Sequence, residues 1–493
     1  MNAVFAELEP RPVWAHFATL CAIPRPSKHE AALRQHLLAW ARALNLQARV
    51  DAAGNLILEK PASPGCGGLP GVVLQGHLDM VCQKNAGTAH DFHRDSIRPV
   101  LRDGWLAAED TTLGADNGIG VALALAALED PELVHPPLEV LLTVDEEAGM
   151  GGARALAPGT LSGRSLINLD TEEWGEFYLG CAGGMDVEAT RPCTREAMPE
   201  GFSYARIAVS GLLGGHSGID IHRGRGNAIR LLLDALDALA ARLSARILSL
   251  EGGTARNAIP REAVATVALP VMRAGELPAL LDTLLADWKL RLAGCDDGVR
   301  LDCTRLAGTG DRPLRAADQS ALLNFLRNAP NGVARMSDAF PGVVESSDSL
   351  GVLRLDGERL RAVFMVRSLH DSEAHMLARR IGDMAAAHGF SAEEIGPYPG
   401  WSPNPASPLL GLARRAYRGA FGQDARLQVI HAGLECGLLA RSHPGLDMLS
   451  FGPDIRGAHA PGERVDIASV GRCWVLLKAL LAALAEPATG QDQ

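Results

Sequence analysis

Two residues able to hold a metal ion stand at the end of an apolar run early in the chain. The apolar residues 72–74 lead into residues 75–79, which read Gln-Gly-His-Leu-Asp. Alternate residues of a strand face opposite sides, so His77 and Asp79 share one side. A histidine binds a metal through one ring nitrogen and needs an acceptor, commonly a carboxylate, for its other N–H. Taken alone, this pattern fits a metal ligand and a polar strand end equally well.

More carboxylates and a second histidine occupy comparable positions downstream. Asp116 lies on a glycine-containing turn before a helix predicted over residues 117–128. Two adjacent glutamates follow a strand predicted over residues 138–144, and Asp170 ends another over residues 165–170. The full set of candidates is His77, Asp79, Asp116, Glu146, Glu147, Asp170 and His459.

Two imidazoles with this many carboxylates have the chemistry of a dinuclear zinc site. Each Zn²⁺ takes about four nitrogen or oxygen ligands, and one carboxylate can bridge a pair of ions. Oxygen-rich sites also accept Mn²⁺ or Co²⁺. Each residue has an ordinary interpretation too: Asp116 as a helix cap, Glu146 and Glu147 as a solvated acidic turn, and His459 as a polar loop residue. Their joint placement at successive strand ends favours the metal site.

Length and charge narrow the classes of protein to consider. A chain of 493 residues with 47% hydrophobic residues predicts two or more domains with large cores. Its formal net charge of −11, without a basic block, argues against nucleic acid or an anionic membrane as a partner. The 9 cysteines never stand in C-x-x-C spacing, and we find neither a secretory signal nor a membrane span. We therefore expect a cytoplasmic protein.

The order of predicted elements indicates an α/β fold. Residues 13–45 read as helical, and the chain then alternates between strands and helices with polar residues at the strand ends, as in an open α/β sheet. We expect a three-layer α/β/α domain with a mixed sheet, formed by residues 1–184 and 397–493. It is interrupted at residues 185–396 by a large α+β lid domain of roughly two similar halves. Such an insertion suits a lid or a dimerisation arm, and a homodimer is compatible with it.

Seven motifs carry a resemblance to a known family. In chain order they are G-H-L-D-M-V (76–81), T-L-G-A-D-N-G-I-G (112–120), D-E-E-A-G-M (145–150), N-L-D (168–170), G-G-H-S-G (214–218), H-A-G-L-E-C-G (431–437) and A-H-A-P-G-E (458–463). They resemble the aminoacyl-histidine dipeptidases, also called peptidase D or cytosolic non-specific dipeptidases, of the zinc aminoacylase and carboxypeptidase superfamily. The likeness runs through nearly the whole chain.

The resemblance implies a role for each candidate ligand. Asp116 would bridge two Zn²⁺ ions, with His77 and Asp170 on one ion and Glu147 and His459 on the other. Asp79 would orient His77, and Glu146 would be the general base. The residues themselves do not distinguish Glu146 from Glu147, because adjacent residues at a strand end diverge and either could ligate.

The resemblance also implies substrate contacts. His216 would stabilise the tetrahedral oxyanion, and Asn257 with Arg367 would hold the C-terminal carboxylate of the substrate, a task suited to a guanidinium. Without the family, His216 would be interpreted as a turn residue, and for Arg367 a surface arginine at a strand end is the alternative. Glu435 could meet the free amine of the substrate.

The expected activity is hydrolysis of short, unblocked dipeptides, Xaa-His and related, by a dizinc-activated water. Closure of the lid would bring the substrate contacts over the metals and exclude longer peptides. The alternative is an N-acyl amino acid amidohydrolase, that is an aminoacylase or deacylase, on the same dizinc site. A metal-storing or scaffold protein is less consistent with an intact Glu146.

Overall fold

Apolar runs of the sequence form the strands of a mixed sheet in the computed structural model, which describes residues 3–198, 200–308 and 312–486. The strands of this first sheet are β1 (Gln47–Val50), β2 (Leu56–Lys60), β3 (Val72–His77), β6 (Leu138–Thr143), β7 (Ser165–Asn168), β8 (Glu176–Cys181), β20 (Arg426–Ile430) and β21 (Asp447–Ser450). Their order among the described residues is β1-β2-β6-β3-β7-β21-β8-β20. β3 is parallel to β6 and β7, and β21 is parallel to β7, whereas β2 is antiparallel to β6.

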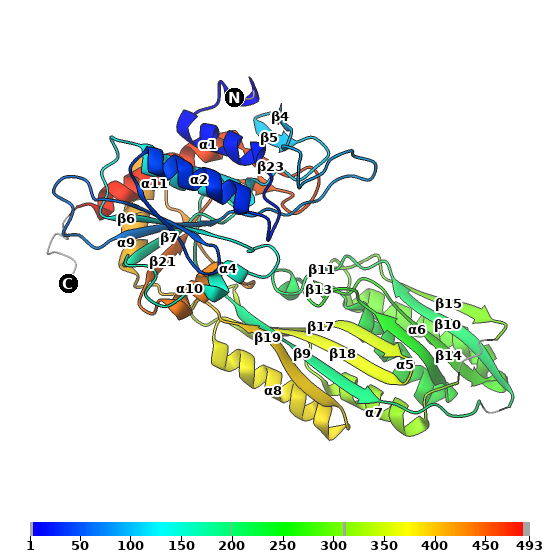
Figure 1. Ribbon diagram of the computed structural model, residues 1–493. Helices are drawn as coiled ribbons and strands as arrows, with labels where there is room; N and C mark the ends of the chain where they lie inside the picture. Colours follow the sequence, from blue (N-terminus) through cyan, green and yellow to red (C-terminus); the bar gives the residue numbers. More distant parts are fainter. Residues whose placement is uncertain (1–2, 199, 309–311, 487–493) are drawn as a thin grey trace. The chain divides into compact units, whose positions relative to one another are not determined.

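Helices cover both faces of this sheet, as the predicted three-layer fold requires. One face carries α1 (Arg11–Ala22), α2 (Ala31–Ala43), α3 (Ala115–Glu129), α9 (Pro408–Phe421) and α11 (Ile467–Leu484). The other carries the short helices α4 (Gly151–Ala155) and α10 (Glu435–Ser442). Figure 1 shows α1, α2 and α11 on one side of the sheet and α4 and α10 on the other. The α/β fold class is thus confirmed.

Alternate side chains of β3 contact the helices on opposite faces of the sheet, as the predicted alternation requires. Val72 and Leu74 belong to the core shared with the helices of the larger layer. Gln75 faces the opposite way, since its side-chain amide donates to Glu435 at the start of α10. All six residues of β3 are buried, so its polar residues must find partners inside the protein.

A small sheet carries the loops around the candidate site. It consists of β4 (Pro99–Arg102), β5 (Trp105–Ala108), β22 (Ile455–Arg456) and β23 (Arg464–Asp466). β23 pairs with both β22 and β5. This pairing joins the loop that holds His459 to the segment that leads into Asp116.

The second unit, Cys181–Ser402 with Ile430–Leu434, is built on an antiparallel sheet. Its elements are β9 (Gly183–Pro192), β10 (Phe202–Ser210), β11 (Gly215–His216), α5 (Ala228–Leu243), β12 (Arg246–Gly252), β13 (Ala258–Ile259), β14 (Ala263–Pro270), α6 (Leu277–Arg291), β15 (Arg300–Leu306), α7 (Ala316–Asn328), β16 (Gly332–Met336), β17 (Val344–Asp356), β18 (Arg359–Ser368), α8 (Asp371–Ala387) and β19 (Ser391–Tyr398). β10 and β12 flank β14, and β18 and β19 flank β9, with a helix between the members of each flanking pair. Each flanking pair and its helix therefore form a β-α-β unit with a further strand between the two members of the pair.

One helical segment differs from the sequence prediction. The helix expected over residues 13–45 is two helices, because Pro24 and Pro26 have no N–H for a helical hydrogen bond.

In the described part of the chain, α11 is long and apolar enough to cross a membrane by length and composition alone. Its residues Leu476, Leu477 and Leu480 are instead packed in the core of the first unit.

Candidate metal centre

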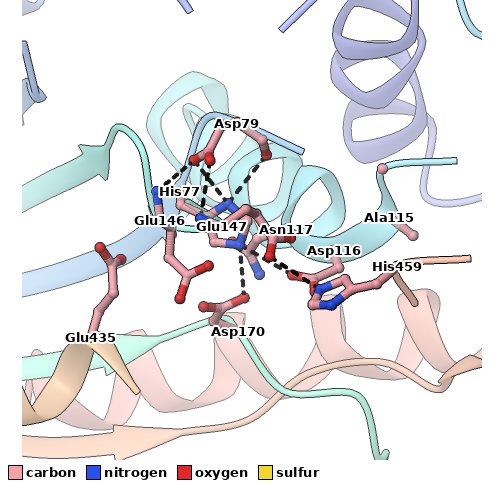
Figure 2. Close-up of polar contacts among 12 residues, drawn as sticks. His77, Asp79, Ala115, Asp116, Asn117, Glu146, Glu147, Asp170, Glu435 and His459 are labelled. Atoms are coloured by element: carbon pink, nitrogen blue, oxygen red, sulfur yellow. Dashed lines mark hydrogen bonds and ion pairs between the residues drawn. The ribbon is translucent and has the colours of Figure 1, made fainter. Parts of the chain in front are cut away.

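The predicted ligands converge at one edge of the first sheet. β6, β3 and β7 are parallel neighbours, so their carboxyl ends meet there. His77 ends β3, Glu146 and Glu147 follow β6, and Asp170 follows β7. Figure 2 shows these side chains gathered with Asp116 and His459.

Asp116 lies between the two histidines. Its Oδ1 is 3.1 Å from Nε2 of His77, and its Oδ2 is 3.2 Å from Nε2 of His459. Nε2 of His77 is also 3.5 Å from Oδ1 of Asp170, and Nε2 of His459 is 3.1 Å from Oε2 of Glu147. Two groups of potential metal ligands therefore share Asp116, and within each group the ligand atoms lie within 4.8 Å of one another.

Glu146 lies outside both groups that share Asp116. It forms a further group of potential ligands with His77 and Glu147. Burial raises the pKa of Glu146 well above its usual value, and the charges of Asp170 and Glu435 add to the effect. A carboxylate in this state is suited to accepting and returning a proton.

Asp79 is fully buried and connects the two sides of the cluster. Its carboxylate accepts the backbone N–H groups of Glu146 and Glu147, at 3.0 and 3.1 Å, and the hydroxyl of Ser27 at 2.7 Å. Its Oδ1 is 3.4 Å from Nδ1 of His77. Burial opposes ionisation, but the hydrogen bond and charge of His77 hold the pKa of Asp79 at about 2. The ionised side chain is thus positioned to orient both His77 and the two glutamates.

The charges of the cluster fit divalent cations. Burial raises the pKa of Asp170, whereas hydrogen bonds from both histidines overcome the burial of Asp116 and hold its pKa well below the usual range. Hydrogen bonds to Asp116 and Glu147 raise the pKa of His459 to about 11. Oε1 of Glu147 is buried and has no hydrogen-bond partner among the described residues. A concentration of carboxylate charge with an unused buried oxygen is suited to nitrogen- and oxygen-liganded metal ions.

The sequence pattern of peptidase family M20/M25/M40 matches residues 73–483, which include every one of these ligands. The chain belongs to peptidase family M20/M25/M40. Family and ligand groups together identify this M20 peptidase as a metal-dependent hydrolase.

Close relatives confirm the predicted resemblance. The chain is 44% identical over 476 residues to the cytosol non-specific dipeptidase of Escherichia coli (strain K12), covering 97% of this chain and 98% of that protein. The crystal structure of aminoacylhistidine dipeptidase from Vibrio alginolyticus matches with 43% identity and a TM-score of 0.90, covering 99% of both chains. Aminopeptidase PepT from Bacillus cereus shares the fold at 16% identity and a TM-score of 0.57, covering 97% of this chain and 100% of that one.

Glu435 of this M20 peptidase is fully buried beside the cluster. One of its oxygens accepts from the hydroxyl of Thr143 and the side-chain amide of Gln75, both at 2.6 Å. The other, Oε1, is buried without a hydrogen-bond partner among the described residues. Burial raises the pKa of Glu435 to about 7. A positively charged group beside the free oxygen would restore ionisation.

The remaining predicted residues, His216, Asn257 and Arg367, belong to the second unit. Nδ1 of His216 accepts the backbone N–H groups of Gly218 and Ile219, at 3.1 and 3.0 Å. Burial and the charge of Arg367 lower the pKa of His216 to about 4, so the ring is neutral. Because Nδ1 accepts two backbone N–H groups, the ring proton is assigned to Nε2. This is the nitrogen that must carry a proton to donate to an oxyanion.

Arg367 is buried, and its Nη1 donates to the hydroxyl of Tyr398 at 2.7 Å. In the part of the chain that the structure describes, the charge of Asp186 acts on Arg367 without forming an ion pair with it, and the Nε of Arg367 has no hydrogen-bond partner. The guanidinium is 3.5 Å from His216. Asn257 is exposed, and its backbone carbonyl accepts from the N–H of Ser217 at 2.9 Å. A buried guanidinium that forms no ion pair is suited to a carboxylate ligand.

Two residues near the metal ligands escaped the sequence analysis. Glu463 stands in the motif over residues 458–463, but only its neighbour His459 was assigned a role there. Arg25 lies in a segment predicted to be plain helix. Glu463 and Arg25 are 2% and 1% exposed. Apart from the motif, no local signal identifies them, because their partners are peptide groups far away in the sequence.

Proposed function

We propose that this M20 peptidase hydrolyses unblocked dipeptides, Xaa-His and related, at a site with two Zn²⁺ ions. The observation that carries the proposal is Asp116, whose two oxygens face two separate imidazoles and so can serve two ions at once. The substrate class comes from the two dipeptidases that match nearly the full chain at 43 and 44% identity.

The proposed ligands divide into the two groups that share Asp116. His77 and Asp170 would hold one ion, and Glu147 and His459 the other, with Mn²⁺ or Co²⁺ as substitutes. When bound, the ions would supply Lewis acidity, which polarises a peptide carbonyl and acidifies water. Asp79 would not bind a metal ion itself but would orient His77 and the two glutamates through its contacts with the His77 ring and with the backbone N–H groups of Glu146 and Glu147.

Glu146 acts as the general base in this proposal. It takes the proton of the attacking water and returns it to the amine that leaves. Its carboxylate is suited to this because burial raises its pKa, and because its backbone is anchored through Asp79. The raised pKa favours uptake of the water's proton by this carboxylate.

One comparison of substrates tests the activity. We expect a free dipeptide to be hydrolysed much faster than its N-acetylated and C-amidated forms, and a chelator to stop the reaction. Preference for the N-acetylated form would instead support the N-acyl amino acid amidohydrolase. Chelator-insensitive hydrolysis, or no hydrolysis of any of the three, would contradict a metallopeptidase.

Arg367 and His216 predict two different kinetic signatures. Arg367→Ala should raise KM for a free dipeptide, with little effect on hydrolysis of the C-amide, since the lost partner is the carboxylate of the substrate. His216→Ala should mainly lower kcat, by about 10²–10³-fold, because an oxyanion donor acts in the transition state. Asn257→Ala should likewise raise KM for a free dipeptide, with little effect on hydrolysis of the C-amide. Steady-state kinetics on both substrates measures the split, and equal losses on amide and free acid would exclude Arg367 as the carboxylate receptor.

Replacing Glu435 should change how strongly the enzyme prefers substrates with a free amine. We propose that its unpaired Oε1 receives the ammonium group of the substrate. Glu435→Gln should raise KM for free dipeptides and reduce the preference over N-acetylated ones. The matched control is Glu139→Gln, a buried carboxylate near the other end of β6, which accepts the N–H of Ser162. An unchanged KM in Glu435→Gln would exclude this role.

The proposal also includes the cellular compartment of the enzyme and its oligomeric state. We infer a cytoplasmic enzyme from the Escherichia coli relative, which is named a cytosol dipeptidase. Activity in the soluble fraction of gently lysed cells would support this location, and activity released by osmotic shock would contradict it. Light scattering would distinguish a monomer from the homodimer that the sequence analysis leaves open.

A further inference from the structure

The carboxylate of Glu463 is buried against the loop that presents Asp116. One oxygen accepts the N–H groups of Leu113 and Gly114, at 2.7 and 2.9 Å. The other accepts those of Ala115 and Asp116, at 2.7 and 3.2 Å. Four consecutive peptide N–H groups therefore point at one side chain, which comes from a loop about 350 residues later in the chain.

Arg25 binds a carbonyl group of the same loop, whereas Glu463 binds its N–H groups. Its Nη2 donates to the carbonyl of Gly114 at 2.6 Å, and its Nη1 donates to the carbonyls of Leu78 and Asp79, at 3.0 and 2.9 Å. Gly114 thus gives its N–H to Glu463 and its carbonyl to Arg25. The guanidinium also joins this loop to the residues that follow His77.

Gly114 shows how closely the loop fits between these two side chains. Its φ of 71° lies in the left-handed region, and a Cβ atom there would fall 2.5 Å from Nη2 of Arg25. Such a contact requires displacement of a buried guanidinium whose partners are backbone carbonyls. Glycine at this position therefore satisfies both the backbone conformation and the approach of Arg25.

Capping of α3 alone does not explain this arrangement. A helix cap satisfies N–H groups inside the first turn, yet Leu113 and Gly114 precede α3. Asp116 itself has φ −79° and ψ 115°, which are not helical. The contacts of Glu463 instead follow the non-helical backbone up to the carboxylate that faces both histidines. Burial of two opposite charges is costly unless peptide groups satisfy them, as they do here.

We propose that Glu463 and Arg25 form a clamp, the Arg25–Glu463 clamp, that positions Asp116 and His77 for metal binding. The inference rests on the proposed function in one respect, namely that Asp116 is a metal ligand shared by two ions. Glu463 and Arg25 touch no candidate substrate or metal ligand atom themselves. They act through the backbone, so they are positioning residues.

The test is Glu463→Gln, which preserves the size of the side chain, removes its charge and replaces one acceptor by an NH₂ donor facing peptide N–H groups. We expect the affinity for Zn²⁺, measured by competition with a chromogenic chelator, to fall by about 10–100-fold, as for other partners that orient ligands. Glu139→Gln is the matched control, and its Zn²⁺ affinity should equal that of the wild type. Equal affinity in Glu463→Gln and the wild type, or an equal loss in the control, would overturn the proposal.

A second measurement does not depend on the variant folding. In the metal-free wild-type enzyme, the amides of residues 113–116 should exchange with solvent as slowly as those of β3, because a buried carboxylate accepts all four. Fast exchange would contradict the clamp. A wild type that binds no Zn²⁺ would contradict the proposed function instead, while the exchange experiment would still decide on the clamp.

Discussion

Replacing Glu146 with glutamine should lower the turnover of a free dipeptide by about 10²–10⁴-fold, the usual contribution of a general base. The variant keeps the size of the side chain and its backbone hydrogen bond to Asp79. Because Glu146 lies outside the two ligand groups that share Asp116, the metal content should stay at the wild-type level. Steady-state kinetics and metal analysis of the same preparation measure both quantities.

Glu147→Gln is the matched control for this prediction. The two glutamates are adjacent and both donate their backbone N–H groups to Asp79, but among the described contacts it is Glu147 that pairs with His459. Glu147→Gln should therefore bind one ion more weakly. If Glu146→Gln loses metal while Glu147→Gln retains it, the roles of the two residues are exchanged.

Replacing Asp116 with asparagine should weaken the binding of both ions and reduce hydrolysis to background. The side chain keeps its size but loses the charge that faces both imidazoles. The loss of Zn²⁺ affinity should exceed the ~10–100-fold typical of a residue that only orients a ligand. Titration of the metal-free variant with Zn²⁺ gives the stoichiometry and the affinity.

His459→Ala distinguishes a shared carboxylate from two independent sites. It removes a ligand of one group only, so one ion should remain bound at an affinity close to that of the wild type. If Asp116→Asn loses one equivalent of Zn²⁺ and keeps the other unchanged, Asp116 serves a single ion. In that case the dinuclear arrangement would need another bridging ligand.

Local patterns of the sequence were enough to predict much of the scaffold. The alternation of β3 correctly separates Val72 and Leu74 from Gln75, because side-chain direction in a strand depends only on neighbouring residues. The predicted helix after Asp116 and the strands before Glu146 and Asp170 also agree with the structure. The helical prediction for residues 13–45 was wrong between α1 and α2, because Pro24 and Pro26 cannot continue a helix.

The sequence alone determined the types of the candidate ligands, their order, the elements that carry them and the family to which the chain belongs. Tertiary structure decided which of them meet. His459 faces Asp116 across 343 residues, and Glu463 binds four peptide groups at a similar separation. Periodicity reports only which side of an element a residue occupies, whereas these contacts depend on how distant loops are brought together by the pairing of β23 with β5. For that reason His77 could be proposed as a ligand once the downstream candidates were considered with it, whereas the contacts of Glu463 and Arg25 with the loop before Asp116 are seen only in the folded chain.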